Sequence, residues 1–150
     1  MRNISFSMTT PQFILGEKDV TRRFSWWDLQ PQTKLMGVEK AMGLKKGEAM
    51  NRLGVILVVK ATTEPLDAMI KDPEYGAEEM RREGYPFGMT DPAEFVHHMA
   101  KLAKKPIDAP VRRIEFKKEF PCAGCGLPMY GEHPHYRHCC SHSCARDFYN

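Results

Sequence analysis

Apolar and polar positions alternate at the start of the chain, where serines separate Ile4, Phe6 and Met8. This period of two is typical of a strand with one buried face. The last predicted strand alternates in the same way, with Ile114 and Phe116 as its inward residues. The segment 52–62 is apolar on both faces, which predicts a central strand. Besides the first segment, the predicted strands lie at residues 33–40, 52–62 and 111–120.

Helical spacing of apolar residues and capping signals predict short helices between these strands. Thr10 and Thr63 are the predicted N-caps of the first two helices, and Gly84 is the predicted end of the third. The last helix has the clearest signals, with Asp91 as its cap and Glu94 at the capping-box position. The predicted helices lie at 10–15, 63–70, 77–82 and 91–105. Four or five strands with short helices between them predict an α+β domain with a twisted, partly closed sheet.

Length and charge narrow the class of protein. A chain of 150 residues accommodates one domain and a small appendage. Its formal net charge of +3 permits a nucleic-acid partner without arguing for one. The first ten residues lack the apolar core of a signal peptide, and the longest apolar run, 54–59, is far shorter than the ~20 residues that span a bilayer. We therefore expect a cytoplasmic protein with no membrane partner.

All five cysteines lie in the last 29 residues, in two groups separated by a loop. Two close pairs held apart by a loop are what a tetrahedral zinc site requires, because each pair forms a chelate. We expect a body at residues 1–119 and a zinc-binding module at residues 120–150 that folds around a structural Zn²⁺. The predicted ligands are Cys122, Cys125, Cys140 and Cys144.

The third zinc ligand has alternatives. Cys139 directly precedes Cys140 and competes with it for the metal. Histidines also surround this position and could replace a cysteine: His133, His135, His138 and His142. A set of free thiols is the remaining alternative, which the paired spacing disfavours.

The stretch "GEKDVTRR" at 16–23 crowds a lysine, a threonine and two arginines into eight residues. Threonine is a poor nucleophile unless a neighbouring base takes its proton. Lys18 could serve as that base for Thr21, because desolvation and the nearby Arg22 and Arg23 would lower the pKa of its amine. The pattern is therefore a candidate catalytic or anion-binding site.

Other polar and aromatic residues could complete this site. Glu83 ends a predicted helix, where the helix dipole disfavours a negative charge, although a surface salt bridge with Arg81 or Arg82 would also explain it. Trp26 and Trp27 follow the arginines and could stack on a base. In an extended chain only one of the two would face a ligand.

The stretch "GEKDVTRR" resembles the G-x-K-x-x-T-x-R signature of the ASCH domain, a small β-barrel of the PUA-like superfamily. "KKGE", "EGYPFGMTDPAEFVHHM" and "VRRIEF" resemble later features of that family in order and spacing, so the resemblance covers roughly residues 3–119. It implies a cleft that holds RNA or a modified base. Some bacterial ASCH proteins are amidohydrolases that remove the acetyl group of N(4)-acetylcytidine, which would assign catalysis to Lys18, Thr21 and Glu83. Independently of the resemblance, Arg22 and Arg23 are candidates for contact with the phosphates of a nucleic acid.

The chain departs from those enzymes by an insertion at 24–44 and by its cysteine-rich tail, as in longer ASCH proteins from phages and prophages. Three functions therefore remain open. The first is an amidohydrolase acting on an acylated cytidine-like nucleoside. The second is a non-catalytic reader of RNA or a modified nucleoside. The third is a module whose zinc tail binds a protein partner.

Overall fold

The computed structural model describes residues 1–85, 91–122 and 125–130. In this part of the chain, six strands form a sheet in which β1, β3, β4, β5 and β2 are neighbours in that order, with β6 paired to β5. β1 is parallel to β3, and all other neighbouring strands are antiparallel. The strands are β1 (Asn3–Ser5), β2 (Val20–Arg23), β3 (Lys34–Val38), β4 (Arg52–Pro65), β5 (Pro110–Pro121) and β6 (Pro128–Tyr130).

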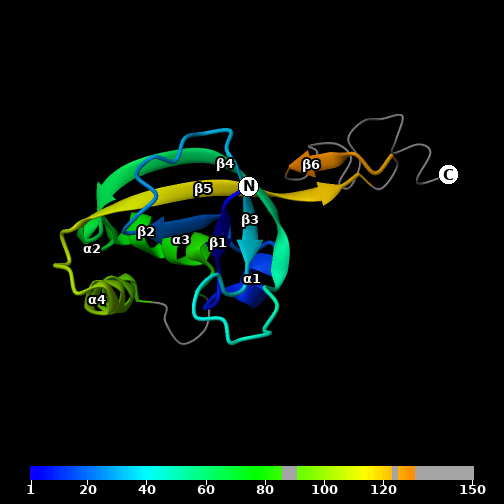
Figure 1. The fold of residues 1–150 in the computed structure, drawn as a ribbon. Coiled ribbons are helices and arrows are strands. Elements are labelled where there is room, and N and C mark those ends of the chain that lie inside the picture. Colours follow the sequence, from blue (N-terminus) through cyan, green and yellow to red (C-terminus); the bar gives the residue numbers. More distant parts are fainter. Residues whose placement is uncertain (86–90, 123–124, 131–150) are drawn as a thin grey trace.

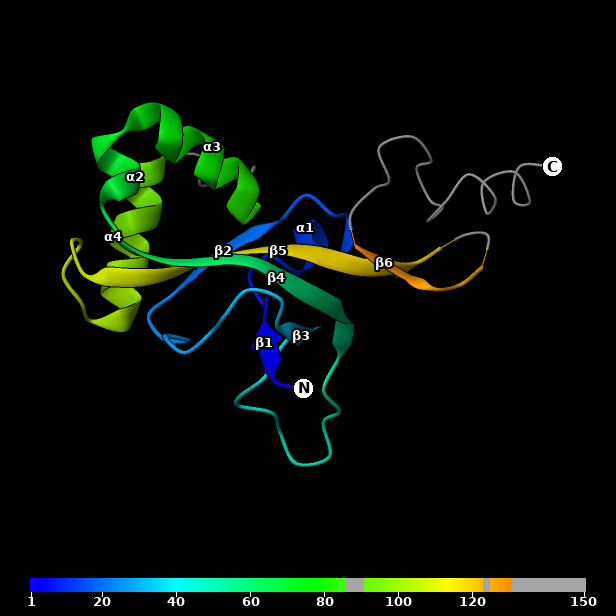
Figure 2. The same cartoon turned by 90° about the horizontal axis from the view of Figure 1, so that it is seen from above.

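Helices cover the sheet in two places (Figures 1 and 2). α2, α3 and α4 are grouped at one end of the long β4–β5 ribbon, and the short α1 lies farther along it. The helices are α1 (Thr10–Ile14), α2 (Ala68–Lys71), α3 (Pro73–Glu83) and α4 (Pro92–Ala103). None of the described helices is long and apolar enough to cross a membrane.

The core has two parts that follow this arrangement. The first lies between α1 and the sheet, where the rings of Phe6 and Phe13 stack with centroids 4.6 Å apart. The second joins α2, α3 and α4 to the sheet and includes the fully buried Leu66 and Met69 and the nearly buried Phe95. Each part buries apolar surface that neither the helices nor the sheet could bury alone.

Several predicted elements are confirmed. β4 lies between β3 and β5, as its apolar pattern predicted. Ile114 and Phe116 point into the core from β5. The side chain of Asp91 accepts a hydrogen bond from Ala93 N at the start of α4. Gly84 ends α3 with a left-handed φ of 83°, which glycine adopts without steric cost.

Three local predictions are wrong. Met8 is 58% exposed, because β1 ends at Ser5 and the chain turns. The N-cap position of α1 is Thr9, and Thr10 instead donates its hydroxyl hydrogen to Phe6 O. Thr63 lies in β4 opposite Arg112, so α2 begins later, at Ala68.

The third helix is longer than its apolar spacing indicated. α3 begins at Pro73, where Asp72 is the N-cap and accepts a hydrogen bond from Tyr75 N. Pro73 suits the first helical position because its missing N–H has no partner there in any helix. The predicted boundary between residues 119 and 120 falls inside β5, which continues to Pro121 and pairs with β6. The division into two domains stays a prediction.

Candidate active site

The signature segment joins α1 to the sheet and runs into β2. Backbone hydrogen bonds fix its start on both sides: Asp19 N donates to Arg82 O in α3, and Phe116 N in β5 donates to Asp19 O. β2 then pairs with β5, with Thr21 opposite Ile114. The segment therefore lies between the end of α3 and the edge of the sheet, which brings its polar side chains to one cavity.

This cavity has a volume of about 360 Å³, within the range of roughly 300–1,000 Å³ that is usual for small-molecule sites. The segment after α1 and β2 contribute Lys18, Thr21, Arg22 and Arg23 to its wall. Residues at the end of α3 and from α4 also line it, including Glu83, Tyr85, Phe95, His98 and Met99, and further residues come from β1 and the turn after it. The charged groups therefore come from the signature segment and α3, and the apolar groups mainly from α4.

Lys18 is buried and has all three ammonium hydrogens engaged. Its Nζ lies 2.9 Å from Val20 O, 2.7 Å from Glu83 O and 3.1 Å from Glu83 Oε2. Burial lowers the pKa of this amine below 10.5, although the Glu83 carboxylate opposes the shift. Arg23 and Arg22 lower the pKa further, as their positions in the sequence predicted, but they contribute less than burial.

Glu83 is the carboxylate that links Lys18 to Arg22. Its Oε1 accepts a hydrogen bond from Arg22 Nη1 at 3.1 Å, while its Oε2 faces Lys18. The alternative explanation of Glu83, a surface salt bridge with Arg81 or Arg82, is wrong, because Arg81 pairs with Glu78, and Arg82 pairs with Asp19 and Glu115. The Glu83 side chain is only 4% exposed. A buried carboxylate between two buried cations holds both of them in fixed positions.

Arg22 belongs to a wider group of buried charges. Its guanidinium also contacts Glu64 at 2.7 Å and Glu79 at 3.4 Å, and Glu79 in turn pairs with Arg113 at 2.7 Å. Burial opposes the charge on Arg22, but the three carboxylates outweigh it and raise the pKa of the guanidinium. Because the Arg22 side chain is 0% exposed, it positions these carboxylates and presents little surface to a ligand.

Thr21 and Arg23 face the cavity side by side. Thr21 is buried, and its Oγ1 accepts a hydrogen bond from Arg23 Nε at 3.2 Å. Arg23 also donates from Nη2 to the backbone oxygen of Ser5. Burial lowers the pKa of Arg23, and Glu83 opposes this shift. No hydrogen bond joins Lys18 Nζ to Thr21 Oγ1 in the described structure, but both groups border the same space.

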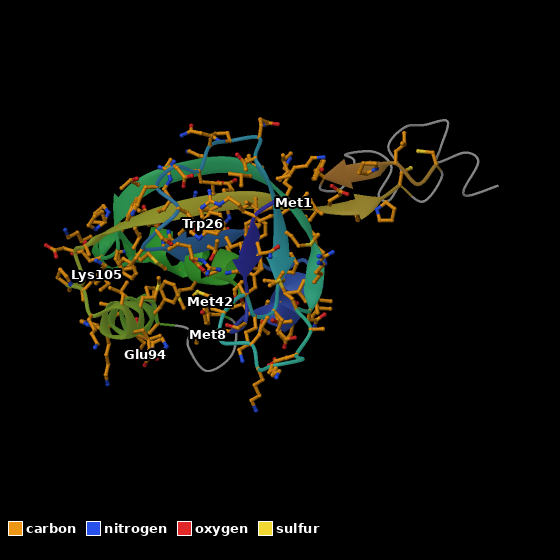
Figure 3. All side chains as sticks on the ribbon, in the orientation of Figure 1. Met1, Met8, Trp26, Met42, Glu94 and Lys105 are labelled. Atoms are coloured by element: carbon orange, nitrogen blue, oxygen red, sulfur yellow. The ribbon has the colours of Figure 1, made fainter. Side chains whose placement is uncertain are left out.

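Neither tryptophan lines the cavity. The chain is not extended here, because Trp26 has a left-handed φ of 67°. Its ring packs against the core and under Arg2, whose guanidinium carbon lies 4.0 Å from the ring centroid, while Trp27 is 49% exposed. Figure 3 shows Trp26 well apart from Met8, which does line the cavity.

Two cavity residues were not recognised from the sequence. Burial raises the pKa of Tyr85 to about 12, so its hydroxyl stays protonated and can donate a hydrogen bond. His98, on α4, also lines the cavity. The available signals were the position of Tyr85 directly after Glu83-Gly84 and the spacing of His98 one turn after the buried Phe95.

Only the first pair of predicted zinc ligands falls within the described residues. Cys122 is buried and Cys125 is exposed. Backbone hydrogen bonds from Cys122 N to Leu127 O and from Gly126 N to Cys122 O close the loop that joins β5 to β6. No cluster of metal-ligating side chains is found in the described ranges. Cys139, Cys140, Cys144 and the four candidate histidines lie outside them.

Comparisons with known proteins identify the fold. Neither a scan against protein-family models nor a search of curated proteins found a match. Among solved structures, an ASCH domain from Lactobacillus crispatus aligns over 78% of each chain, with 13% identity and a TM-score of 0.52. A DUF984-family protein from Enterococcus faecalis aligns over 89% of this chain and 84% of its own, with 14% identity and a TM-score of 0.48. The chain thus has an ASCH-like fold, a mixed α/β arrangement with a six-stranded sheet and short helices.

Proposed function

We propose that the cavity binds a modified nucleobase or nucleoside and hydrolyses an acyl amide on its exocyclic nitrogen. One observation carries the proposal: the Thr21 hydroxyl, the Lys18 amine and the Glu83 carboxylate border a single cavity, although 65 residues separate Lys18 from Glu83. Acyl transfer needs a nucleophile, a base with a lowered pKa and a group that orients the base, and these three residues can supply them.

In the first step, neutral Lys18 takes the proton of the Thr21 hydroxyl as Oγ1 attacks the amide carbon. Because Nζ and Oγ1 are not hydrogen-bonded in the structure, this transfer runs through a bound water or a rotation of the lysine side chain. The C–N bond then breaks, and Lys18 returns the proton to the departing exocyclic nitrogen. Water next hydrolyses the acyl-Thr21 ester, which releases the carboxylic acid and regenerates the hydroxyl.

The walls of the cavity suit such a ligand. Phe95 and Met99 offer apolar surface to a planar ring, and the Tyr85 hydroxyl and Arg23 guanidinium offer donors to its oxygens. Burial keeps water away from the charged groups, which strengthens their interactions with a bound amide.

Non-catalytic binding of RNA is the second candidate. Arg23 lines the cavity and forms no ion pair with a carboxylate among the described residues, so its guanidinium favours a ligand that bears phosphate. A reader would bind RNA with an affinity that falls steeply with salt and that survives removal of the Thr21 hydroxyl.

We also propose that residues 120–150 bind one structural Zn²⁺ through Cys122, Cys125, Cys140 and Cys144. Binding of the metal would make this segment a separate small module. Two backbone hydrogen bonds support the proposal: Cys122 N donates to Leu127 O, and Gly126 N donates to Cys122 O, which brings Cys122 close to the residue that follows Cys125. A protein partner that docks on this tail is compatible with either function of the cavity.

The experiment is a time course of N(4)-acetylcytidine hydrolysis by the parent protein, Thr21→Ala and Thr63→Ala. Thr63 is a matched control, because it is an exposed strand residue outside the cavity that also accepts an arginine hydrogen bond at 3.2 Å. We expect cytidine release by the parent and Thr63→Ala and none by Thr21→Ala. Absence of release by a folded parent would overturn the amidohydrolase, and salt-sensitive RNA binding in that case would support the reader.

A further inference from the structure

His98 is a polar residue on an otherwise apolar face of α4. It lies on α4 between Phe95 and Leu102, which share the same helix face at spacings of three and four residues. All three residues line the cavity, and among the α4 residues that do so His98 has the only polar side chain. A larger apolar residue would suit this face of the helix better.

The ring nitrogen of His98 is also unsatisfied. Its Nε2 is fully buried, and the described residues offer it no hydrogen-bond partner. Buried polar atoms without a partner are rare and costly, and each calls for an explanation. A neutral imidazole has one donor and one acceptor nitrogen, so a bound group of either kind could satisfy it.

We propose that His98 is a positioning and specificity residue whose imidazole ring turns when the ligand binds and brings the buried Nε2 within hydrogen-bonding distance of the ligand. This inference rests on the proposed function and deepens it. Lys18, Thr21 and Glu83 come from the signature segment and the end of α3, whereas His98 comes from α4. The reacting amide faces the first group, so His98 contacts a ring or sugar atom that does not react. The cavity therefore selects a ligand with a second polar group in addition to the acyl amide.

This role predicts opposite effects on binding and stability. His98→Leu removes the hydrogen bond to the ligand, so the dissociation constant should rise about tenfold. The same change replaces an unsatisfied nitrogen by apolar surface, so the melting temperature should stay the same or rise. A residue needed only for packing would show a fall in melting temperature, with any loss of binding following from it.

The test measures the dissociation constant and KM for N(4)-acetylcytidine, kcat, and the melting temperature for four proteins. These are the parent, His98→Leu, His98→Gln and His97→Leu. The exposed His97 on the same helix is the matched control, and glutamine can restore a hydrogen bond close to the position of Nε2.

We expect His98→Leu to weaken binding and raise KM about tenfold with kcat nearly unchanged. His98→Gln should recover part of this loss, and His97→Leu should match the parent. Unchanged affinity in His98→Leu, or a clear fall in its melting temperature, would overturn the role of His98 while leaving the proposed function intact. A parent that neither binds nor hydrolyses N(4)-acetylcytidine would overturn both.

Discussion

Glu83→Gln tests the energetic role of the carboxylate that joins Lys18 and Arg22. The substitution keeps the shape of the side chain and removes its charge. Arg22 retains the carboxylates of Glu64 and Glu79, but Lys18 loses the one carboxylate within ion-pair distance in the described structure. Both partners are nearly inaccessible, with Lys18 2% and Arg22 0% exposed, so solvent cannot replace the lost interaction.

Removal of one partner from a buried ion pair costs about 3–5 kcal/mol, because the other charge stays buried. For a chain of this size, each kcal/mol lowers the melting temperature by roughly 2–4 °C, so Glu83→Gln should melt roughly 6–20 °C below the parent. The measurement is urea and thermal unfolding followed by circular dichroism. Glu78→Gln is the control on the same helix, because its pair with Arg81 is exposed and should contribute little.

The pH dependence of the free energy of unfolding provides a second check on the same substitution. Burial lowers the pKa of folded Lys18, so between that pKa and 10.5 the unfolded chain binds more protons than the folded chain. Stability from this group therefore rises with pH across that window. The lost carboxylate lowers the folded pKa further, so the deficit of Glu83→Gln should shrink as the pH is raised. A loss below about 1 kcal/mol at neutral pH, or a deficit that grows with pH, would refute the reasoning.

Three further predictions follow from the site, the helix packing and the tail. The reaction needs the neutral form of Lys18, and burial lowers the pKa of this amine. We therefore expect kcat/KM to rise with pH and to level off below pH 10.5, and a kcat/KM that falls over this range would contradict the role of the amine. Gly76→Ala would place its Cβ 2.0 Å from the backbone oxygen of Met69. The free energy of unfolding, measured with urea, should therefore fall by about 3 kcal/mol or more. A variant as stable as the parent would rule out this close contact of α2 and α3. Native mass spectrometry should find one zinc per chain in the parent and in Cys139→Ser but none in Cys140→Ser; the reverse result would make Cys139 the ligand.

Local chemistry in the sequence was enough to predict some elements. Asp91 caps α4 and Gly84 ends α3, because capping depends on residues only a few positions apart. Thr63 shows the limit of this reasoning. Its cap-like position was overridden by pairing with Arg112 in β5, a strand almost fifty residues away. Strand pairing of this kind depends on contacts that a single local pattern does not contain.

The candidate site shows the same limit for charges. The crowding of Lys18, Thr21 and the arginines was visible in the sequence, but the partners of Glu83 were not. Neighbouring arginines suggested a surface pair, although residues one and two positions apart on a helix do not face each other. The fold instead brings Glu83 to Lys18 and Arg22 across more than 60 residues. The buried nitrogen of His98 likewise became visible only when α4 was placed against the cavity.

These contacts divide the charged residues of the signature into two groups with different tasks. Arg22 is enclosed by three carboxylates and holds Glu83 in place, whereas Lys18 and Arg23 remain beside the open space of the cavity. Loss of activity in an Arg22 or Glu83 variant would therefore mix a structural defect with a chemical one. Thr21 takes part in no ion pair, so its variants give the cleaner test of chemistry. A Thr21→Ala protein that keeps the parent's stability but loses hydrolysis would separate catalysis from the ion-pair network that supports it.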